Sequence, residues 1–191
     1  GVSSPIPPQE GNPEERGVQV LWAPWRMSYI EGEKSSECIF CALTDDAALR
    51  PMLILGVSAH ARVMLNKYPY NNGHLLVAPH RHTAQLTDLS EHEYADLMAL
   101  LRRAADIVTL VFRPQGLNIG MNLGVCAGAG IADHLHWHIV PRWVGDTNFM
   151  PVVGSVRVMP QHLLDSYDRL RPYFAPLPAG AEAVQGSSLR K

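Results

Sequence analysis

The chain has 191 residues, of which 47% are hydrophobic and 18% are charged, a composition that suits one globular domain with loose ends. Sixteen Lys and Arg against eighteen Asp and Glu give a formal net charge of -2, so no broad cationic surface is available for duplex nucleic acid. No apolar run approaches the roughly 20 residues that cross a bilayer, and the first residues lack the pattern of a signal peptide. We therefore expect a soluble cytoplasmic protein with no membrane partner.

The two ends of the sequence differ in composition from its middle. Residues 1–17 are rich in proline, glycine and glutamate and carry too little apolar surface to offset the entropy of ordering, so we expect a disordered leader. Residues 176–191 share this character and are expected to form a flexible tail. The intervening residues 18–175 are expected to form the folded domain, which starts with an aromatic segment of no clear period.

In chain order, the first predicted elements are a hairpin and a long helix. Two short apolar segments, residues 63–65 and 74–78, flank a Pro-Tyr-Asn-Asn-Gly turn and predict a hairpin. Ser90 and Glu93 then form a capping-box pattern. Apolar residues recur at helical spacing after this pattern and predict a helix over residues 90–112.

The later part of the sequence predicts two more strands and a short helix. Residues 117–123 and 135–140 are the strand candidates, and the small-residue loop 124–130 separates them. Residues 161–170 predict a final short helix. The layout indicates an α+β fold with a mainly antiparallel sheet, one long helix and a shorter C-terminal helix.

Three histidines alternate along the last predicted strand, at His134, His136 and His138. The side-chain period of two in a strand places the three imidazoles on one face and Leu135 and Trp137 on the other. Nine histidines scattered at random would rarely produce this spacing, so surface histidines without a role are a weak explanation. One face of the strand is therefore expected to pack against the core while the other presents three bases.

The residues alone leave two chemistries open for these histidines. The three imidazoles could converge on one zinc ion, or one of them could be a nucleophile whose neighbours hold the anionic groups of a substrate. The loop before the strand bears on the choice, because Gly128, Ala129 and Gly130 let backbone N–H groups approach a ligand closely. This loop favours a phosphate-bearing substrate, although a small-residue loop is also typical of a plain turn.

Cysteines and further histidines suggest a separate metal site. Cys38 and Cys41 have the spacing of half a tetrahedral zinc site or of a redox motif, and two buried free cysteines are the plainer alternative. Two more ligands are needed, and His80 and His82 follow the predicted hairpin. Cys126 lies in the glycine-rich loop, either as a small apolar filler or as a redox-sensitive thiol.

The histidine segment resembles the signature of the histidine triad (HIT) family, in which three histidines alternate with apolar residues. The other landmarks of that family have counterparts at residues 72–79, 118–122 and 141–143, so the resemblance covers roughly residues 36–143. The flanking sequence is most similar to the diadenosine-tetraphosphate phosphorylase branch, through residues 21–27, the Tyr-Pro-Tyr-Asn turn and the run at 141–149.

The resemblance implies a HIT-like fold with an antiparallel sheet of about five strands, and a role for each histidine of the site. His136 corresponds to the nucleophile, which attacks the α-phosphorus of an adenine nucleotide and forms a nucleotidyl-histidine intermediate. His138 would bind the α-phosphate or the leaving oxygen, and His74 would support the triad through a hydrogen bond. The implied substrate-binding residues are Asn66, Asn122, Gly128, Ala129, Gly130 and His138.

The resemblance also implies a ligand set for the metal. Members of the family with a Cys-x-x-Cys start pair those cysteines with two histidines, which correspond here to His82 and His134. Four protein ligands, Cys38, Cys41, His82 and His134, would make the Zn²⁺ structural rather than water-activating. His80 remains an alternative to His82.

The leading functional hypothesis is a nucleotidyltransferase or hydrolase that acts on diadenosine tetraphosphate or another adenine nucleotide, with phosphate or water as the acceptor. A nucleoside phosphoramidase, which would use the same His136, is the alternative enzyme. A non-enzymatic nucleotide-binding protein is the alternative from another class, although a mere binder would have no need of His136. By resemblance we expect a homodimer that pairs through the long helix and a strand next to the site, with a tetramer as the alternative in the phosphorylase branch.

Overall fold

The structure is a computed structural model and describes residues 38–41, 49–146 and 161–174. The expected leader, the aromatic segment, the branch-like residues 21–27 and the expected tail lie outside the described residues. The division of the chain into leader, domain and tail therefore stays a prediction. In the part of the chain that the structure describes, no helix has the length and apolar character needed to cross a membrane.

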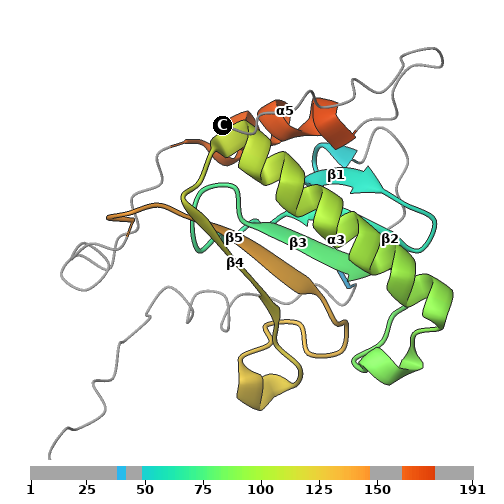
Figure 1. Cartoon of the computed structure of the whole chain (residues 1–191). Coiled ribbons are helices and arrows are strands. Elements are labelled where there is room, and N and C mark those ends of the chain that lie inside the picture. Colours follow the sequence, from blue (N-terminus) through green and yellow to red (C-terminus); the bar gives the residue numbers. More distant parts are fainter. Residues whose placement is uncertain (1–37, 42–48, 147–160, 175–191) are drawn as a thin grey trace, which may run out of the picture. The chain divides into compact units, whose positions relative to one another are not determined.

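Five antiparallel strands form one sheet in the order β1-β2-β3-β5-β4 (Figure 1). The strands are β1 Ile54–Val57, β2 Ala61–Leu65, β3 Leu75–Pro79, β4 Gly116–Met121 and β5 Trp137–Arg142. The predicted α+β fold, its hairpin and its two later strands are confirmed. Strand β1 has no predicted counterpart, because it has only four residues and its pairing with β2 shifts register between Ile54 and Gly56, which is too little to show a strand period.

The long helix α3, Glu91–Phe112, begins at the predicted capping box. The Ser90 Oγ accepts the Glu93 N–H at 3.3 Å, and the Glu93 carboxylate accepts the Ser90 N–H at 2.9 Å. The buried residues of the helix are Leu97, Leu100, Leu101, Ala104, Ile107 and Val108. These residues recur at the helical spacing that predicted the helix, whereas Tyr94, in its first turn, is exposed.

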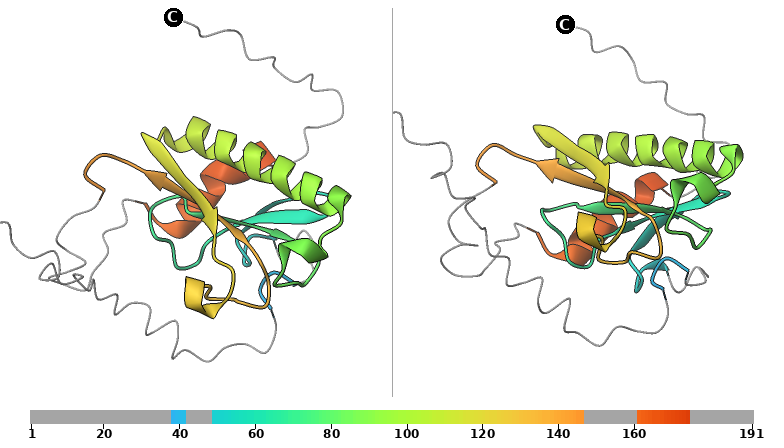
Figure 2. Two further views of the ribbon diagram at one scale, coloured as in Figure 1. Left: turned by 60° about the horizontal axis from the view of Figure 1, so that its bottom comes forward. Right: turned by 90° about the horizontal axis from the view of Figure 1, so that it is seen from below.

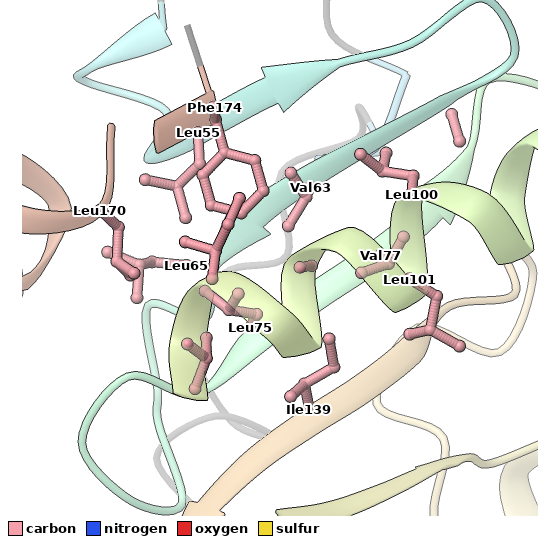
Figure 3. Packing of buried hydrophobic residues seen from close by; sticks show 14 of the residues in the cluster. Leu55, Val63, Leu65, Leu75, Val77, Leu100, Leu101, Ile139, Leu170 and Phe174 are labelled. Atoms are coloured by element: carbon pink, nitrogen blue, oxygen red, sulfur yellow. The ribbon is translucent and has the colours of Figure 1, made fainter. Parts of the chain in front are cut away.

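The main core lies between the sheet and its two helices. Side chains of the sheet converge on α3 and on the shorter helix α5, Leu163–Phe174, which contacts β1 and α3. Figure 3 shows this packing, with Leu55, Val63, Leu65, Leu75, Val77 and Ile139 on the sheet and Leu100, Leu101, Leu170 and Phe174 on the helices. The predicted C-terminal helix is thus confirmed, with its bounds shifted toward the C-terminus.

The opposite face of the sheet carries a smaller apolar cluster, formed by Phe40, Ile54, Met64, Leu76 and Ala78. Because the middle of the sheet is covered on both faces, every residue of β2 and β3 is buried. This explains why β3 is a continuous apolar run, whereas β2 includes one buried charged residue, Arg62. Figure 2 shows residues 38–41 and the short turn η3, Val125–Ala127, on the side of the sheet away from α3. The candidate site lies on this second face.

The turn between β2 and β3 depends on Gly73. Its φ of +72° lies in the left-handed region, and a Cβ at this position would lie 2.7 Å from the ring of Phe112. Asn71 ties the same turn to the end of β5, because its Nδ2 donates to the Pro141 carbonyl at 3.0 Å and to the Asp146 carboxylate at 2.8 Å. His74 directly follows Gly73, so the conformation of the turn decides where its imidazole lies.

Replacing Gly73 with alanine should lower the free energy of unfolding by about 1 to 3 kcal/mol, because a side chain is strained at this φ and also meets Phe112. Chemical denaturation measures the change. Gly116→Ala is the matched control, since a Cβ at Gly116 would have no neighbour within 4 Å. Equal losses in the two variants would contradict the role given to Gly73.

Candidate active site and metal cluster

The alternating segment divides its side chains between the two faces of the sheet. His134 and His136 lie just before β5, and His138 lies within the strand. Leu135 and Ile139 belong to the main core, against which Trp137 packs. The imidazoles of His134 and His136 contact the ring of Phe40 on the opposite face. The prediction that this segment has one face in the core and presents its histidines on the other is confirmed.

The four predicted metal ligands come together from three separate segments of the chain. Their ligand atoms, on Cys38, Cys41, His82 and His134, all lie within 4.8 Å of one another. The Cys41 Sγ lies 3.1 Å from the His82 Nδ1 and 3.5 Å from the His134 Nδ1, and the Cys38 Sγ lies 3.4 Å from the His134 Nδ1. Two thiols and two imidazoles form a donor set that suits tetrahedral zinc, so the residues fit the metal.

The surroundings of His134 prepare its ring for metal binding. Its Nε2 lies 2.9 Å from the Pro79 carbonyl, which can only accept, so this nitrogen carries the proton and the Nδ1 lone pair faces the thiols. Burial lowers the pKa of His134 to about 4 and keeps the ring neutral. Burial and the neighbouring Cys38 raise the pKa of Cys41, and a bound cation would favour the thiolate instead.

His80 does not reach the cysteines. Its Nε2 lies 3.1 Å from the Ser58 carbonyl, and its Nδ1 lies 3.1 Å from a guanidinium nitrogen of the buried Arg62. Both ring nitrogens are therefore used between β2 and the preceding loop. Of the two histidines considered for the metal, the structure brings His82 to the cluster.

One ring nitrogen of His136 is held by a hydrogen bond to the backbone, and the other keeps a lone pair. Its Nδ1 donates to the His134 carbonyl at 2.9 Å, so the neutral ring keeps its lone pair on Nε2. Burial lowers the pKa of His136, which favours this neutral form. The Phe40 ring packs 4.8 Å from the imidazole, between centroids. No sequence pattern predicted this contact, apart from the place of Phe40 between the two cysteines.

A chain of hydrogen bonds sets the tautomer of His138. The Tyr70 backbone N–H donates to the His74 Nδ1 at 3.0 Å, so that nitrogen has no proton and the His74 Nε2 carries one. The His74 Nε2 lies 2.9 Å from the His138 Nδ1 and donates to it. Burial, reinforced by His136, lowers the pKa of His138 to about 4. The neutral ring of His138 therefore holds its own proton on Nε2.

The three imidazoles thus have different partners and do not converge on one point. His134 faces the cysteines, the Nδ1 of His136 faces a carbonyl, and the Nδ1 of His138 faces His74. Among the described residues, the only member of the triad in a metal-ligand cluster is His134. The arrangement does not support a three-His zinc site, and it leaves an imidazole lone pair and an imidazole N–H on neighbouring rings.

The proposed phosphate loop is more self-contained than expected. The N–H of Gly128 donates to the Val125 carbonyl at 2.9 Å, and the N–H of Ala129 donates to the Gly124 carbonyl at 3.3 Å. A phosphate held there would have to compete with these two bonds. Among the residues expected to bind substrate, Gly130 is exposed in this loop.

The two asparagines expected at the substrate lie on different segments, directly after β4 and directly after β2. Asn122 is half-buried directly after β4. The Asn66 Oδ1 accepts the Tyr68 N–H at 2.9 Å, which turns its Nδ2 to within 3.3 Å of the His74 Nδ1. The Asn66 side chain therefore supports the turn and His74, whatever contact it makes with a ribose.

The sheet, the long helix and the row of histidines define an α+β fold shared with solved histidine triad proteins. One is a Zn-bound histidine triad family protein from Mycobacterium smegmatis, with a TM-score of 0.55 and 28% identity over 74% of this chain and 95% of that chain. Another is a histidine triad nucleotide-binding protein from Sulfolobus tokodaii, with a TM-score of 0.53 and 26% identity over 72% and 89% of the two chains.

Sequence comparison places the chain in a family. The HIT domain model matches residues 50–144. A Mycobacterium tuberculosis protein named AP-4-A phosphorylase is 40% identical over an alignment of 157 positions, which covers 78% of this chain and 80% of that protein. Adenosine 5'-monophosphoramidase hnt1 of Schizosaccharomyces pombe is 32% identical over 55% of this chain and 74% of its own length. The chain belongs to the HIT family.

Single substitutions of His82 and His80 should have different effects on metal affinity, because only His82 lies in the cluster. We expect His82→Ala to weaken Co²⁺ binding by roughly a hundredfold or more, about one quarter of the free energy that four-ligand sites supply. His80→Ala should leave the affinity within about threefold, because His80 bonds Ser58 and Arg62 instead. Optical titration with Co²⁺ gives both affinities, and a larger loss in His80→Ala would contradict the ligand set.

Proposed function

We propose that this chain is an enzyme that cleaves at the α-phosphate of an adenine nucleotide, with diadenosine tetraphosphate as its preferred substrate. The observation that carries the proposal is the orientation of His136. Its Nδ1 donates to the His134 carbonyl, which leaves the Nε2 lone pair as a nucleophile of fixed direction. A neutral imidazole held in one tautomer needs no base to activate it at pH 7.

In the first step, the Nε2 of His136 attacks the α-phosphorus and forms a nitrogen–phosphorus bond. The bond to the bridging oxygen breaks, and its electron pair leaves with the polyphosphate. The N–H on the His138 Nε2 can donate to an α-phosphate oxygen or to the leaving oxygen, stabilising the charge that develops there. Asn122 and the loop at Gly128, Ala129 and Gly130 are the proposed supports for the phosphate oxygens.

In the second step, an oxygen of the acceptor attacks the same phosphorus and the bond to His136 breaks. Water as the acceptor releases AMP, and inorganic phosphate releases ADP. With diadenosine tetraphosphate, the first step has already released ATP. The similarity to the protein named AP-4-A phosphorylase favours phosphate as the acceptor.

A phosphoramidase activity is the second candidate, supported by the similarity to the protein named adenosine 5'-monophosphoramidase hnt1. The same His136 would attack the phosphorus, and the leaving amine would need a proton. The N–H on the His138 Nε2 is the group that could supply it. The product analysis below distinguishes this candidate from the first.

We further propose that Cys38, Cys41, His82 and His134 hold a structural Zn²⁺. When bound, the ion supplies a cross-link between the segment at 38–41, the loop after β3 that carries His82, and His134. No coordination position is left for water once four protein ligands bind. The chain's own residues then hold the backbone carbonyl of His134, to which His136 donates, in one place.

We infer a homodimer from the resemblance to the family. One edge of the described sheet is β4, and its exposed Ile119 is where a second copy would pack. A cytoplasmic location is part of the same proposal.

The nucleophile is tested by replacing His136 with asparagine. We expect kcat to fall at least about 1,000-fold, since the covalent step is lost, while nucleotide affinity stays within about tenfold. His92→Asn, at an exposed position on α3, is the control and should keep full activity. Steady-state kinetics and calorimetric binding give the two quantities, and substantial turnover by His136→Asn would rule out the proposed intermediate.

The substrate and acceptor are tested by incubating the protein with diadenosine tetraphosphate, with and without phosphate. ADP and ATP that form only with phosphate are the expected products. AMP and ATP without phosphate would identify water as the acceptor instead. Absence of turnover here, with release of AMP from adenosine 5'-phosphoramidate, would favour the second candidate.

A further inference from the structure

Tyr70 covers the two histidines that form the hydrogen-bonded pair at the edge of the site. It lies in the turn between β2 and β3, and its ring centroid is 4.7 Å from that of His74 and 5.9 Å from that of His138. The interplanar angle with His138 is 17°, so the two rings are stacked. Aromatic rings at these separations attract one another beyond the area that they bury.

His138 is held on several sides, and each contact restrains a different motion. The His74 Nε2–H bonds its Nδ1, which fixes a distance within the plane of the ring. His136 meets it edge-on, with 4.9 Å between centroids and a 63° angle. Among the described residues, Tyr70 supplies the stacked contact on the face of the ring. Without that contact, the hydrogen bond to His74 and the tilted or edge contacts with His74 and His136 would remain, but no ring stacked on the imidazole face would resist its rotation about the Cβ–Cγ bond.

The position of Tyr70 does not depend on its own ring. Asn71 anchors the turn to Pro141 and Asp146, and Asp146 also forms an ion pair with Arg142 at 2.7 Å. The hydrogen bond from Tyr70 to His74 comes from the backbone N–H, so it survives any change of side chain except proline. The contribution of the ring can therefore be separated from that of the turn.

We propose that Tyr70 is a positioning residue whose aromatic ring holds the imidazole of His138 in the orientation that keeps its Nδ1 on His74 and its Nε2–H available to a phosphate. The inference rests on the proposed function for the identity of the phosphate. The orientation itself is a property of the protein without substrate. It follows that Tyr70 acts through His138 and that any aromatic side chain of similar size should serve.

Nitrogen NMR of the histidine rings tests the orientation without any turnover. In the full-length protein with its metal, labelled at histidine nitrogens, we expect the protonated nitrogen of His138 to be Nε2. Tyr70→Leu and Tyr70→Ala should broaden or average the two nitrogen signals, whereas Tyr70→Phe should keep them as in the parent. Tyr94→Ala removes a tyrosine of matched exposure, 44% against 43%, and should change neither ring.

Kinetics then tests the consequence. We expect Tyr70→Leu to lower kcat by about tenfold with KM changed less than about twofold, and Tyr70→Phe to restore kcat to within about twofold of the parent. Unfolding midpoints identify which variants are folded. If Tyr70→Ala does not fold, the kinetics and the nitrogen spectra of Tyr70→Leu test the role of the ring.

Two results would overturn the inference. One is a Tyr70→Leu protein with parent-like His138 nitrogen signals. The other is a Tyr70→Phe protein as impaired as Tyr70→Leu, which would mean that the hydroxyl matters and not the ring. If no nucleotide is turned over by the parent, the proposed function fails while the nitrogen spectra still decide the role of Tyr70.

Discussion

The alternation of side chains along residues 134–139 is the constraint on which the rest of the structure depends. Leu135 and Ile139 are fully or almost fully buried in the core beneath α3, so the histidines between them must face the other way. Pairing of His138 with Leu76 and Gly120 fixes this register from both sides. A slip of one residue would place imidazoles in the apolar core. The packing energy that folds the sheet therefore also positions the bases.

Phe40 connects the metal cluster to this row of bases. Its ring is fully buried and packs 5.1 Å from His134 and 4.8 Å from His136, between centroids. In the described residues, the segment at 38–41 has a turn bond from Cys41 to Cys38 but no strand partner. Ligation of both cysteines would fix the short turn that carries Phe40. An ion that takes no part in the reaction would then determine how firmly the wall beside His136 is held.

Local signals in the sequence predicted those parts of the molecule that local physics determines. The capping box predicted the start of α3, and the period of two predicted which face of β5 carries the histidines. The choice between His80 and His82 was beyond such signals, because it depends on Arg62 and Ser58 in other segments. The stacking of Tyr70 on His138 was likewise not predictable, since it arises only when the turn before β3 folds against β5. His74, which follows the same turn, is 64 residues away from His138 in the sequence.

The contrast between His136 and His138 shows how the fold can assign different chemistry to identical side chains. Burial lowers the pKa of both rings, so charge does not distinguish them at pH 7. Their Nδ1 partners do: His136 faces a carbonyl, which must accept, and His138 faces the protonated Nε2 of His74, which donates. The remaining nitrogen is consequently a lone pair on one ring and an N–H on the other. A nucleophile and a proton donor can thus stand side by side without a formal charge on either.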